Sequence, residues 1–230
     1  MTTIASNLQA VRDTITAATT ETGRAPDDVN LLAVSKTFAP EAIRAAYEAG
    51  QTRFAESYVQ EALHKIAALH ELPIEWHFIG PIQSNKTRAI AEHFGWVHSV
   101  GRLKIAERLS AQRPAHLPPL QICLQVNISG EDSKSGVPPG EAAQLAKAVA
   151  LLPHLRLRGL MAIPEPSNDV GAQRANFAQL RKLFEQLNHQ GLQLDTLSMG
   201  MSHDFAAAIA EGATMVRIGA AIFGDREYPR

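Results

Sequence analysis

Apolar residues recur along the chain at two alternating spacings, which predict helices and strands in turn. Residues 4–15 carry apolar side chains at helical spacing, so the chain begins with a predicted helix. The short apolar run 31–34 follows and is typical of a buried strand. A second helix is predicted from Pro40, which is favoured at a helix start, to Gly50, which is favoured just past a helix end.

The same succession of strand and helix repeats to the end of the chain. Strands are predicted at residues 31–34, 54–55, 76–79, 96–100, 122–128, 155–161, 196–199 and 215–218. Helices are predicted from Pro40, from Val59, from Ser84 as N-cap, from Leu103, and around 142–151, 177–187 and 206–209. Such alternation indicates a parallel sheet with helical crossovers. Eight units in 230 residues favour an α/β fold, a single (β/α)8 TIM-like barrel with an extra N-terminal helix. The alternative is an open doubly wound sheet.

The composition is that of an ordinary globular protein, with 45% hydrophobic and 20% charged residues. No linker-like stretch divides the chain, so residues 1–230 are expected to form a single domain. The formal net charge of −1 gives no reason to expect a nucleic-acid partner. A lone cysteine, Cys123, cannot form an internal disulfide and points to a reducing compartment. Residues 1–10 do not resemble a signal peptide and no run reaches membrane length, so we expect a soluble cytoplasmic protein without a membrane partner.

Lys36 stands where the first predicted strand ends. Functional sites of barrels form at the carboxyl ends of the strands. A lysine placed after a buried run is partly desolvated, which favours the neutral amine and Schiff-base chemistry with aldehydes. The alternative is a lysine whose charged end reaches out to water.

The ends of the last two strands predict an anion site beside Lys36. Ser202 follows the seventh strand, either as a plain helix N-cap or as part of an anion cradle with its neighbours Gly200 and Met201. Gly219 follows the eighth strand, either as a tight turn or as a point of close backbone approach to a ligand. Because the first and last strands are neighbours in a closed barrel, an aldehyde-reactive lysine and a phosphate cradle meet, as pyridoxal 5′-phosphate (PLP) requires.

The chain resembles the PLP homeostasis protein family, also called the YggS/PROSC family, over nearly its whole length. The matching stretches are 33–37 (AVSKT), 76–86 (WHFIGPIQSNK), 126–128 (VNI), 133–137 (SKSGV), 158–164 (RGLMAIP), 197–202 (LSMGMS) and 216–219 (VRIG). The resemblance implies a barrel like the N-terminal domain of alanine racemase. It also implies PLP held as a covalent aldimine on Lys36, Arg217 at the pyridine nitrogen and Gly219 at the phosphate. An arginine at that nitrogen leaves it unprotonated and weakens the electron sink; without the resemblance, Arg217 could equally form a salt bridge inside the barrel.

Two positions depart from the family pattern. The family usually has asparagine where this chain has Ser57, so any cofactor contact of that asparagine is in doubt here. The family often has a hydroxyl residue after the glycine of Arg-Ile-Gly, and this chain has Ala220. The Ala220 amide remains as a donor to phosphate, and a lost hydrogen bond weakens binding by about 1 kcal/mol.

Other side chains are candidates with simpler alternatives. His77, inside the third strand, and Met161, at the end of the sixth, are further candidates for cofactor contact, although His77 could equally be a satisfied core histidine. Lys134 could offer a second amine or an anion contact, with a solvated loop lysine as the alternative. The histidine spacings and the lone cysteine predict no metal site.

Two functions of different classes remain open. The first is a carrier and regulator of intracellular PLP and amino-acid balance without turnover, which the family resemblance implies. The second is a small PLP-dependent racemase. Racemisation needs proton donors on both faces of the substrate carbon, and beyond Lys36 no convincing second donor is found among Tyr47, Tyr58 and Tyr228. We therefore predict a carrier with no catalytic residues, a monomer by resemblance, whose partners are PLP and apo-forms of PLP-dependent enzymes.

Overall fold

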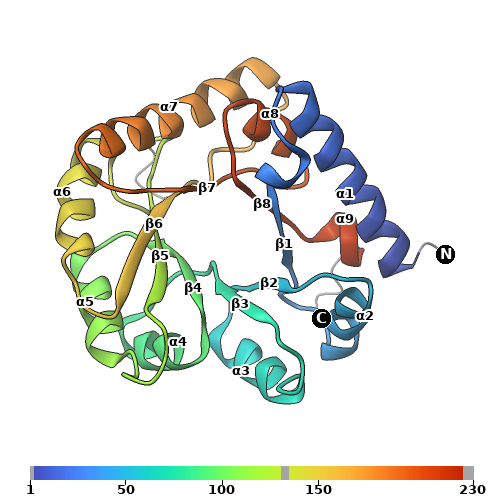
Figure 1. The fold of residues 1–230 in the computed structure, drawn as a ribbon, viewed down its shortest axis with the longest axis horizontal. Helices are drawn as coiled ribbons and strands as arrows, with labels where there is room; N and C mark the ends of the chain where they lie inside the picture. The colour runs from blue at the N-terminus through green and yellow to red at the C-terminus, as the bar shows by residue number, and fades with distance from the viewer. Residues whose placement is uncertain (1–2, 131–134, 225–230) are drawn as a thin grey trace.

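The computed structural model describes residues 3–130 and 135–224, and its strands form a parallel barrel ringed by helices (Figure 1). Within those residues the eight strands are β1 (Asn30–Val34), β2 (Arg53–Glu56), β3 (Glu75–Phe78), β4 (Trp96–Val100), β5 (Leu120–Gln125), β6 (Leu155–Met161), β7 (Thr196–Ser198) and β8 (Met215–Ile218). The α-helices are α1 (Ile4–Glu21), α2 (Pro40–Glu48), α3 (Val59–Ala68), α4 (Thr87–His93), α5 (Leu103–Gln112), α6 (Pro139–Ala150), α7 (Val170–His189), α8 (Phe205–Ala210) and α9 (Ala220–Phe223). Two short 3-10 helices are η1 (Pro26–Asp28) and η2 (Ser84–Lys86).

The sheet is closed, which decides between the two architectures that the sequence allowed. Each strand pairs in parallel with the next along the chain, and β8 pairs with β1. At the closure, Leu32 lies opposite Arg217 and Ala33 opposite Ile218. The prediction of a (β/α)8 barrel is therefore confirmed, and the open sheet is excluded.

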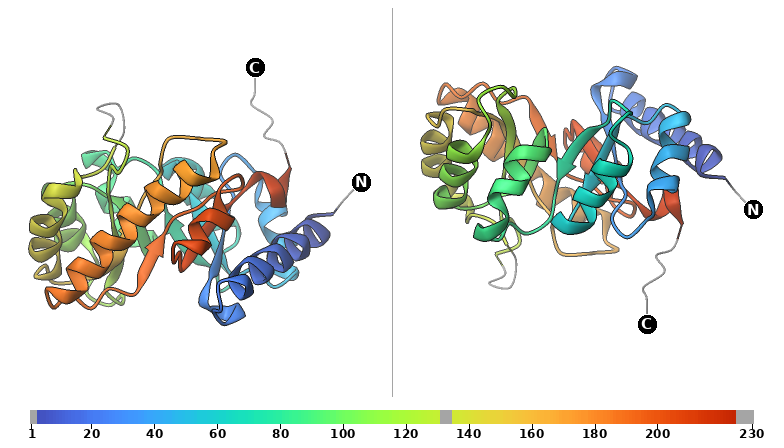
Figure 2. Two further views of the ribbon diagram at one scale, coloured as in Figure 1. Left: turned by 90° about the horizontal axis from the view of Figure 1, so that it is seen from above. Right: turned by 90° about the horizontal axis from the view of Figure 1, so that it is seen from below.

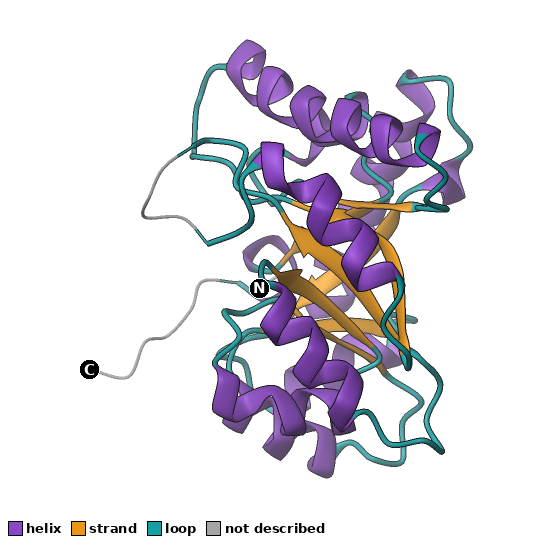
Figure 3. Ribbon diagram, turned by 90° about the vertical axis from the view of Figure 1, so that its left-hand side faces the viewer, coloured by secondary structure: helices purple, strands orange, loops and turns teal. Residues whose placement is uncertain are grey.

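Alternation along each strand sorts side chains to the two faces of the barrel wall. In β1, Ala33 packs into the large core between strands and helices, whereas Leu32 and Val34 point to the interior, where they form a small cluster with Ala55 and Met215. Figure 3 shows the strands enclosed between layers of helices. The barrel interior is thus filled by side chains rather than left as a channel.

The extra N-terminal helix α1 is confirmed, and it covers the seam where the barrel closes. It packs against α8, α9 and α2, and Figures 1 and 2 show it beside α9 at one edge of the molecule. Its buried face is Leu8, Val11, Ile15 and Thr19. The Asn7 side-chain amide donates to the Ile222 carbonyl at 3.1 Å, which ties the two ends of the described chain together.

Three local predictions differ from the structure. Ser84 is not an N-cap; it lies inside η2, and the helix that follows begins only at Thr87. The fifth strand ends at Gln125 instead of residue 128. It ends there because the chain turns to pair with a loop: the Val137 amide donates to the Gln125 carbonyl at 2.8 Å. The short helix α9 was not predicted, since its four residues are too few to show a helical period.

Candidate functional site

Lys36 lies in a turn directly beyond β1, at the carboxyl mouth, the end of the barrel where the strands end. Its side chain is half-buried. Before it, Ser35 extends the β1–β2 pairing, since its amide donates to the Ala55 carbonyl at 3.0 Å. The Phe38 amide donates to the Ser35 carbonyl at 3.1 Å and closes the turn. Thr37 has a φ of 72°, in the left-handed region that β-branched residues rarely adopt.

Three charged side chains, Glu56, Glu61 and Lys65, pack against this turn, and we call them the acid–lysine cluster. The Lys65 ammonium donates to Glu56 Oε1 and to the Ser35 carbonyl, each at 2.8 Å, and also to Glu61 Oε1. The Ser35 hydroxyl donates to Glu56 Oε1 and the Thr37 amide to Glu61 Oε1, each at 2.6 Å. The cluster therefore forms hydrogen bonds with both residues that flank Lys36, namely Ser35 and Thr37.

Burial dominates the electrostatics of this cluster. The side chains of Glu56 and Lys65 are 0% and 3% exposed. Desolvation raises the pKa of Glu56, against the opposing effect of the Lys65 ammonium and the Ser35 hydroxyl. Sequence reasoning missed these residues. The one available signal was the four-residue spacing of Glu61 and Lys65 on a predicted helix, which is typical of a surface ion pair rather than of a buried one.

Arg217 joins the ends of three strands at the carboxyl mouth. It is 3% exposed, and its Nη1 donates to the Ser198 carbonyl at 2.6 Å and to the Ser198 hydroxyl at 2.8 Å. Its Nη2 donates to the Ala162 carbonyl at 2.9 Å. Among the described residues no carboxylate lies within ion-pair distance of the Arg217 guanidinium. These residues therefore do not form the salt bridge inside the barrel that was the alternative for Arg217. Burial lowers the pKa of Arg217 to about 10, which leaves it charged at neutral pH.

A chain of hydrogen bonds crosses the barrel interior from Arg217. The Ser198 hydroxyl lies 2.9 Å from His98 Nδ1, His98 Nε2 lies 2.9 Å from His77 Nδ1, and His77 Nε2 lies 2.9 Å from Glu75 Oε1. The hydrogen bond from His77 is the main reason why the pKa of Glu75 is lowered, so Glu75 is a carboxylate and must accept. The bonds then run in one direction, each group donating to the next from Arg217 to Glu75.

His77 and His98, the two histidines in this row of hydrogen bonds, are neutral at physiological pH. Burial lowers the pKa of His77, and burial together with His77 and Arg217 lowers the pKa of His98 far below 6.5. Both ring nitrogens of His77 are bonded within the protein. The geometry therefore favours the core-histidine alternative for His77 over direct contact with a ligand.

The loop after β7 is built differently from its prediction. Ser202 lies in a turn and is not the N-cap of α8; that position is Asp204. The Asp204 carboxylate accepts from the Met201 amide at 2.6 Å, so this amide already has an anionic partner. Gly200 has a φ of 94°, and its carbonyl accepts from the Arg217 amide at 3.0 Å. No hydrogen bond to the Ser202 hydroxyl is formed by the residues that the structure describes.

The remaining predicted residues lie on several elements around the same mouth. Gly219 is buried beyond β8, and Ala220 is exposed as the first residue of α9. Met161 ends β6 and is fully buried against Trp96 and Cys123 inside the barrel.

Ser57 follows β2 and is 9% exposed. A side chain at Gly80 would place its Cβ 2.1 Å from the Ser57 carbonyl, so glycine permits this close contact between the loops after β2 and β3.

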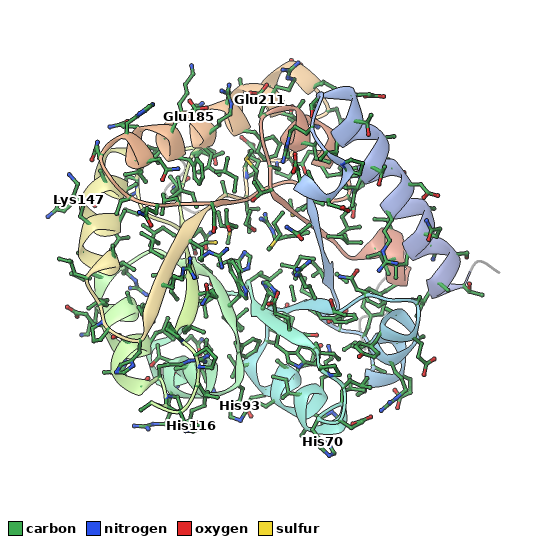
Figure 4. The ribbon with its side chains drawn as sticks, in the orientation of Figure 1. His70, His93, His116, Lys147, Glu185 and Glu211 are labelled. Atoms are coloured by element: carbon green, nitrogen blue, oxygen red, sulfur yellow. The ribbon has the colours of Figure 1, made fainter. Side chains whose placement is uncertain are left out.

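The remaining expectations concern residues away from this mouth or residues that the structure does not describe. Lys134 and Tyr228 lie outside the described residues. Burial raises the pKa of the Cys123 thiol to about 12, so it is unreactive. Within residues 3–130 and 135–224, no three His, Cys, Asp or Glu side chains are grouped to hold a metal ion. Figure 4 shows His70, His93 and His116 at the periphery of the molecule. In the same ranges, no helix is both long and apolar enough to cross a membrane.

A cavity of about 870 Å³ lies at the opposite end of the barrel, where the strands begin. Its wall contains the ion pairs Arg53–Glu75 at 3.2 Å and Arg158–Asp195 at 2.7 Å. These four side chains pair with one another, so none of them is left as an unpaired charge for a ligand in this cavity. The lysine, the buried arginine and the glycine-containing loops all meet at the carboxyl mouth instead.

Comparison with known proteins is consistent with the barrel fold. Residues 6–227 match the family model described as alanine racemase, N-terminal domain. The chain is 63% identical to the pyridoxal phosphate homeostasis protein of Pseudomonas aeruginosa over 228 residues, which is 99% of this chain and 98% of that protein. It is 55% identical to the protein of the same name in Escherichia coli over 230 residues, again 99% and 98% of the two chains.

Solved structures give the same relationship. PipY of Synechococcus elongatus is 39% identical, and the match covers 96% of this chain and all of PipY. The TM-score is 0.86 for the PipY structure without PLP and 0.84 for the PipY structure with PLP bound. The chain therefore belongs to the family of pyridoxal phosphate homeostasis proteins, built on the alanine racemase N-terminal domain fold.

Proposed function

We propose that this protein binds PLP as a Schiff base on Lys36 and serves in the homeostasis of intracellular PLP and amino acids, without catalytic turnover. When bound, PLP supplies an aldehyde that condenses with a primary amine, forming one C=N bond and releasing one water. The observation that supports the proposal most directly is the pairing of β1 with β8. It brings the end of β1, which Lys36 follows, next to the end of β8, which carries Arg217 and precedes Gly219.

The groups at the carboxyl mouth include a proposed partner for each of the aldehyde, the pyridine nitrogen and the phosphate of PLP. Lys36 offers the amine. Arg217 has five N–H groups, of which three bond to Ser198 and Ala162, so two remain within the described protein for an acceptor such as a pyridine nitrogen. For the phosphate, the Ser202 hydroxyl and the backbone amides of Gly219 and Ala220 are the proposed donors.

Other predicted contacts have different support. The Met201 amide is bonded to Asp204, so it would serve a phosphate only if that carboxylate moved. Gly200 supports the site through its bond to the Arg217 amide. Ser57 follows β2 and Met161 is the last residue of β6, at the same end of the barrel, and both remain proposed contacts.

The absence of turnover is proposed from the proton chemistry of the mouth. Racemisation needs a second acid or base across the cofactor from the lysine. Tyr58 is 53% exposed at the start of α3, and Tyr47 packs into the core between helices and strands. The names of the relatives, which refer to PLP homeostasis, support the same role. We further propose that the protein acts in the cytoplasm as a monomer and supplies PLP to apo-enzymes.

The test is a visible absorption spectrum of the purified protein with added PLP, beside Lys36→Ala. We expect a Schiff-base band in the wild-type protein and its loss in Lys36→Ala. Lys147→Ala is the matched control, since this lysine is exposed on the outer face of α6 and should leave the band unchanged (Figure 4). A band that survives in Lys36→Ala would refute the assignment. Release of inverted amino acid by the PLP-loaded protein would favour a racemase instead.

A further inference from the structure

We propose that Glu56, Glu61 and Lys65 are positioning residues for Lys36, because they fix the backbone on both of its sides and thereby direct its amine at the carboxyl mouth. The inference rests on the proposed function, since it gives these residues a purpose only if Lys36 is the reactive amine. None of the three is assigned a contact with PLP. Their action passes through the turn that carries the lysine.

All three N–H groups of the Lys65 ammonium are used in hydrogen bonds. A lysine ammonium has three N–H donors, and each has an acceptor here: the Ser35 carbonyl, Glu56 Oε1 and Glu61 Oε1. These acceptors come from the end of β1, the end of β2 and the first turn of α3. The ammonium therefore links three elements at one point. Since its side chain is 3% exposed, water cannot readily replace these bonds.

The second anchor acts on the other side of the lysine. Thr37 has a φ of 72°, a conformation that is unfavourable for a β-branched residue, so the turn would relax if it were not held. The bond from the Thr37 amide to Glu61 Oε1 at 2.6 Å opposes this relaxation. Bonds from the amide to a charged acceptor are stronger than those to a neutral one. Ser35 and Thr37 are thus both fixed by the acid–lysine cluster.

A fixed backbone determines where the lysine side chain begins and in which direction it leaves the turn. An amine held in a reactive orientation reacts faster than a freely moving one, because less conformational freedom is lost on the way to reaction. Loosening the turn should therefore slow reaction at Lys36 while leaving the amine itself intact.

The experiment compares Glu61→Ala and Glu61→Gln with the control Glu71→Ala. Glutamine keeps an acceptor oxygen for the Thr37 amide, and Glu71 pairs with the exposed side chains of Arg44 and His70. In the PLP-free protein, we expect amide hydrogen exchange of residues 35–38 to become about 10-fold faster in Glu61→Ala, as for the loss of one charged hydrogen bond. The rate constant for appearance of the Schiff-base band should fall by a similar factor of about 10. Glu61→Gln should recover much of both, and Glu71→Ala should change neither.

The outcomes separate this inference from the proposed function. Unchanged exchange in Glu61→Ala would overturn the inference, because the cluster would not hold the turn. Faster exchange with an unchanged rate constant would also overturn it, because the order of the turn would not matter to the amine. A slower reaction without faster exchange would show direct action of Glu61 and overturn it as well. Absence of the band in the wild-type protein would overturn the proposed function, and with it the role of the cluster, whatever the exchange data show.

Discussion

The buried ammonium of Lys65 stabilises the buried carboxyl group of Glu56. Lys65 is the cationic partner of Glu56, and both are nearly inaccessible to water. Removal of one partner leaves the other as an uncompensated buried charge, which is more costly than the pair itself. The two residues therefore depend on each other for stability as well as for the position of the turn.

Lys65→Met should lower the free energy of unfolding by about 3–5 kcal/mol at neutral pH, measured by urea denaturation. The deficit should shrink as the pH falls, because protonation of Glu56, whose pKa burial already raises, removes the stranded charge. Lys147→Met, at an exposed position, should change stability by less than about 0.5 kcal/mol. A similar small effect of Lys65→Met would show that the pair is not a buried one.

His98 should make stability depend on pH just below neutrality. In the unfolded chain it takes up a proton as the pH falls below 6.5, whereas burial keeps it neutral in the folded protein. The unfolded state then binds more protons, so the free energy of unfolding should fall between about pH 6.5 and pH 5.

His98→Gln keeps a donor and an acceptor but does not titrate. Its stability curve should be flatter than that of the wild type, by up to about 1.4 kcal/mol per pH unit over this range. His70→Gln is the control, because the His70 side chain is 81% exposed (Figure 4). Parallel curves for the wild type and His98→Gln would contradict the buried neutral state.

At the scale of elements, Gly200 controls how the loop after β7 meets α8. Its φ of 94° is left-handed, and a Cβ there would lie 2.7 Å from the Ala208 Cβ and 3.0 Å from the Phe205 Cα. A larger residue would therefore push α8 away from the loop that carries Ser202. The same displacement would strain the bond from the Arg217 amide to the Gly200 carbonyl.

Gly200→Ala can be compared with Gly191→Ala, which matches it in backbone but not in packing. Gly191 has a φ of 93° and no atom within 4 Å of an added Cβ. We expect Gly191→Ala to cost about 1–2 kcal/mol for the backbone alone. Gly200→Ala should cost about 1–3 kcal/mol more because of overpacking, measured by urea denaturation. Equal losses would mean that α8 moves away at little cost.

At the scale of the whole molecule, the seam between β8 and β1 depends on α1. This helix precedes the barrel in sequence, yet it packs against the last two helices and is tied to Ile222. We propose that residues 1–230 form one domain in which loss of α1 would expose the seam.

The two tryptophans report on two layers of this domain, since Trp76 packs in the outer core and Trp96 inside the barrel.

The variants Trp76→Phe and Trp96→Phe each retain one tryptophan. In each variant, tryptophan fluorescence should therefore show a single unfolding transition in urea, with one midpoint. That midpoint should coincide with the one from far-ultraviolet circular dichroism of the same variant, as cooperative unfolding requires. A fluorescence transition that is separate from the loss of helix in either variant would show that the barrel interior and its helical shell are separable units.

The sequence alone determined the eight strands and the order of strands and helices, because hydrophobic period is a local property. Strands β4, β6 and β8 begin and end at the predicted residues, and the alternation of strands and helices predicted a parallel barrel. It also placed Lys36 and Gly219 at the carboxyl mouth, since a residue that follows a strand must lie at that strand's end. The family resemblance rested likewise on residues that can be read in order.

Only the tertiary structure decided which polar groups meet. Lys65 lies 30 residues from Ser35, and no spacing along the chain shows that α3 brings it under the turn. His98 and Ser198 are 100 residues apart and touch because their strands face each other across the barrel. Asp204, not Ser202, is the N-cap of α8, and its carboxylate accepts from the Met201 amide in the preceding loop. Partners of buried polar groups are chosen by contacts between distant segments, and such contacts exist only once the barrel has closed.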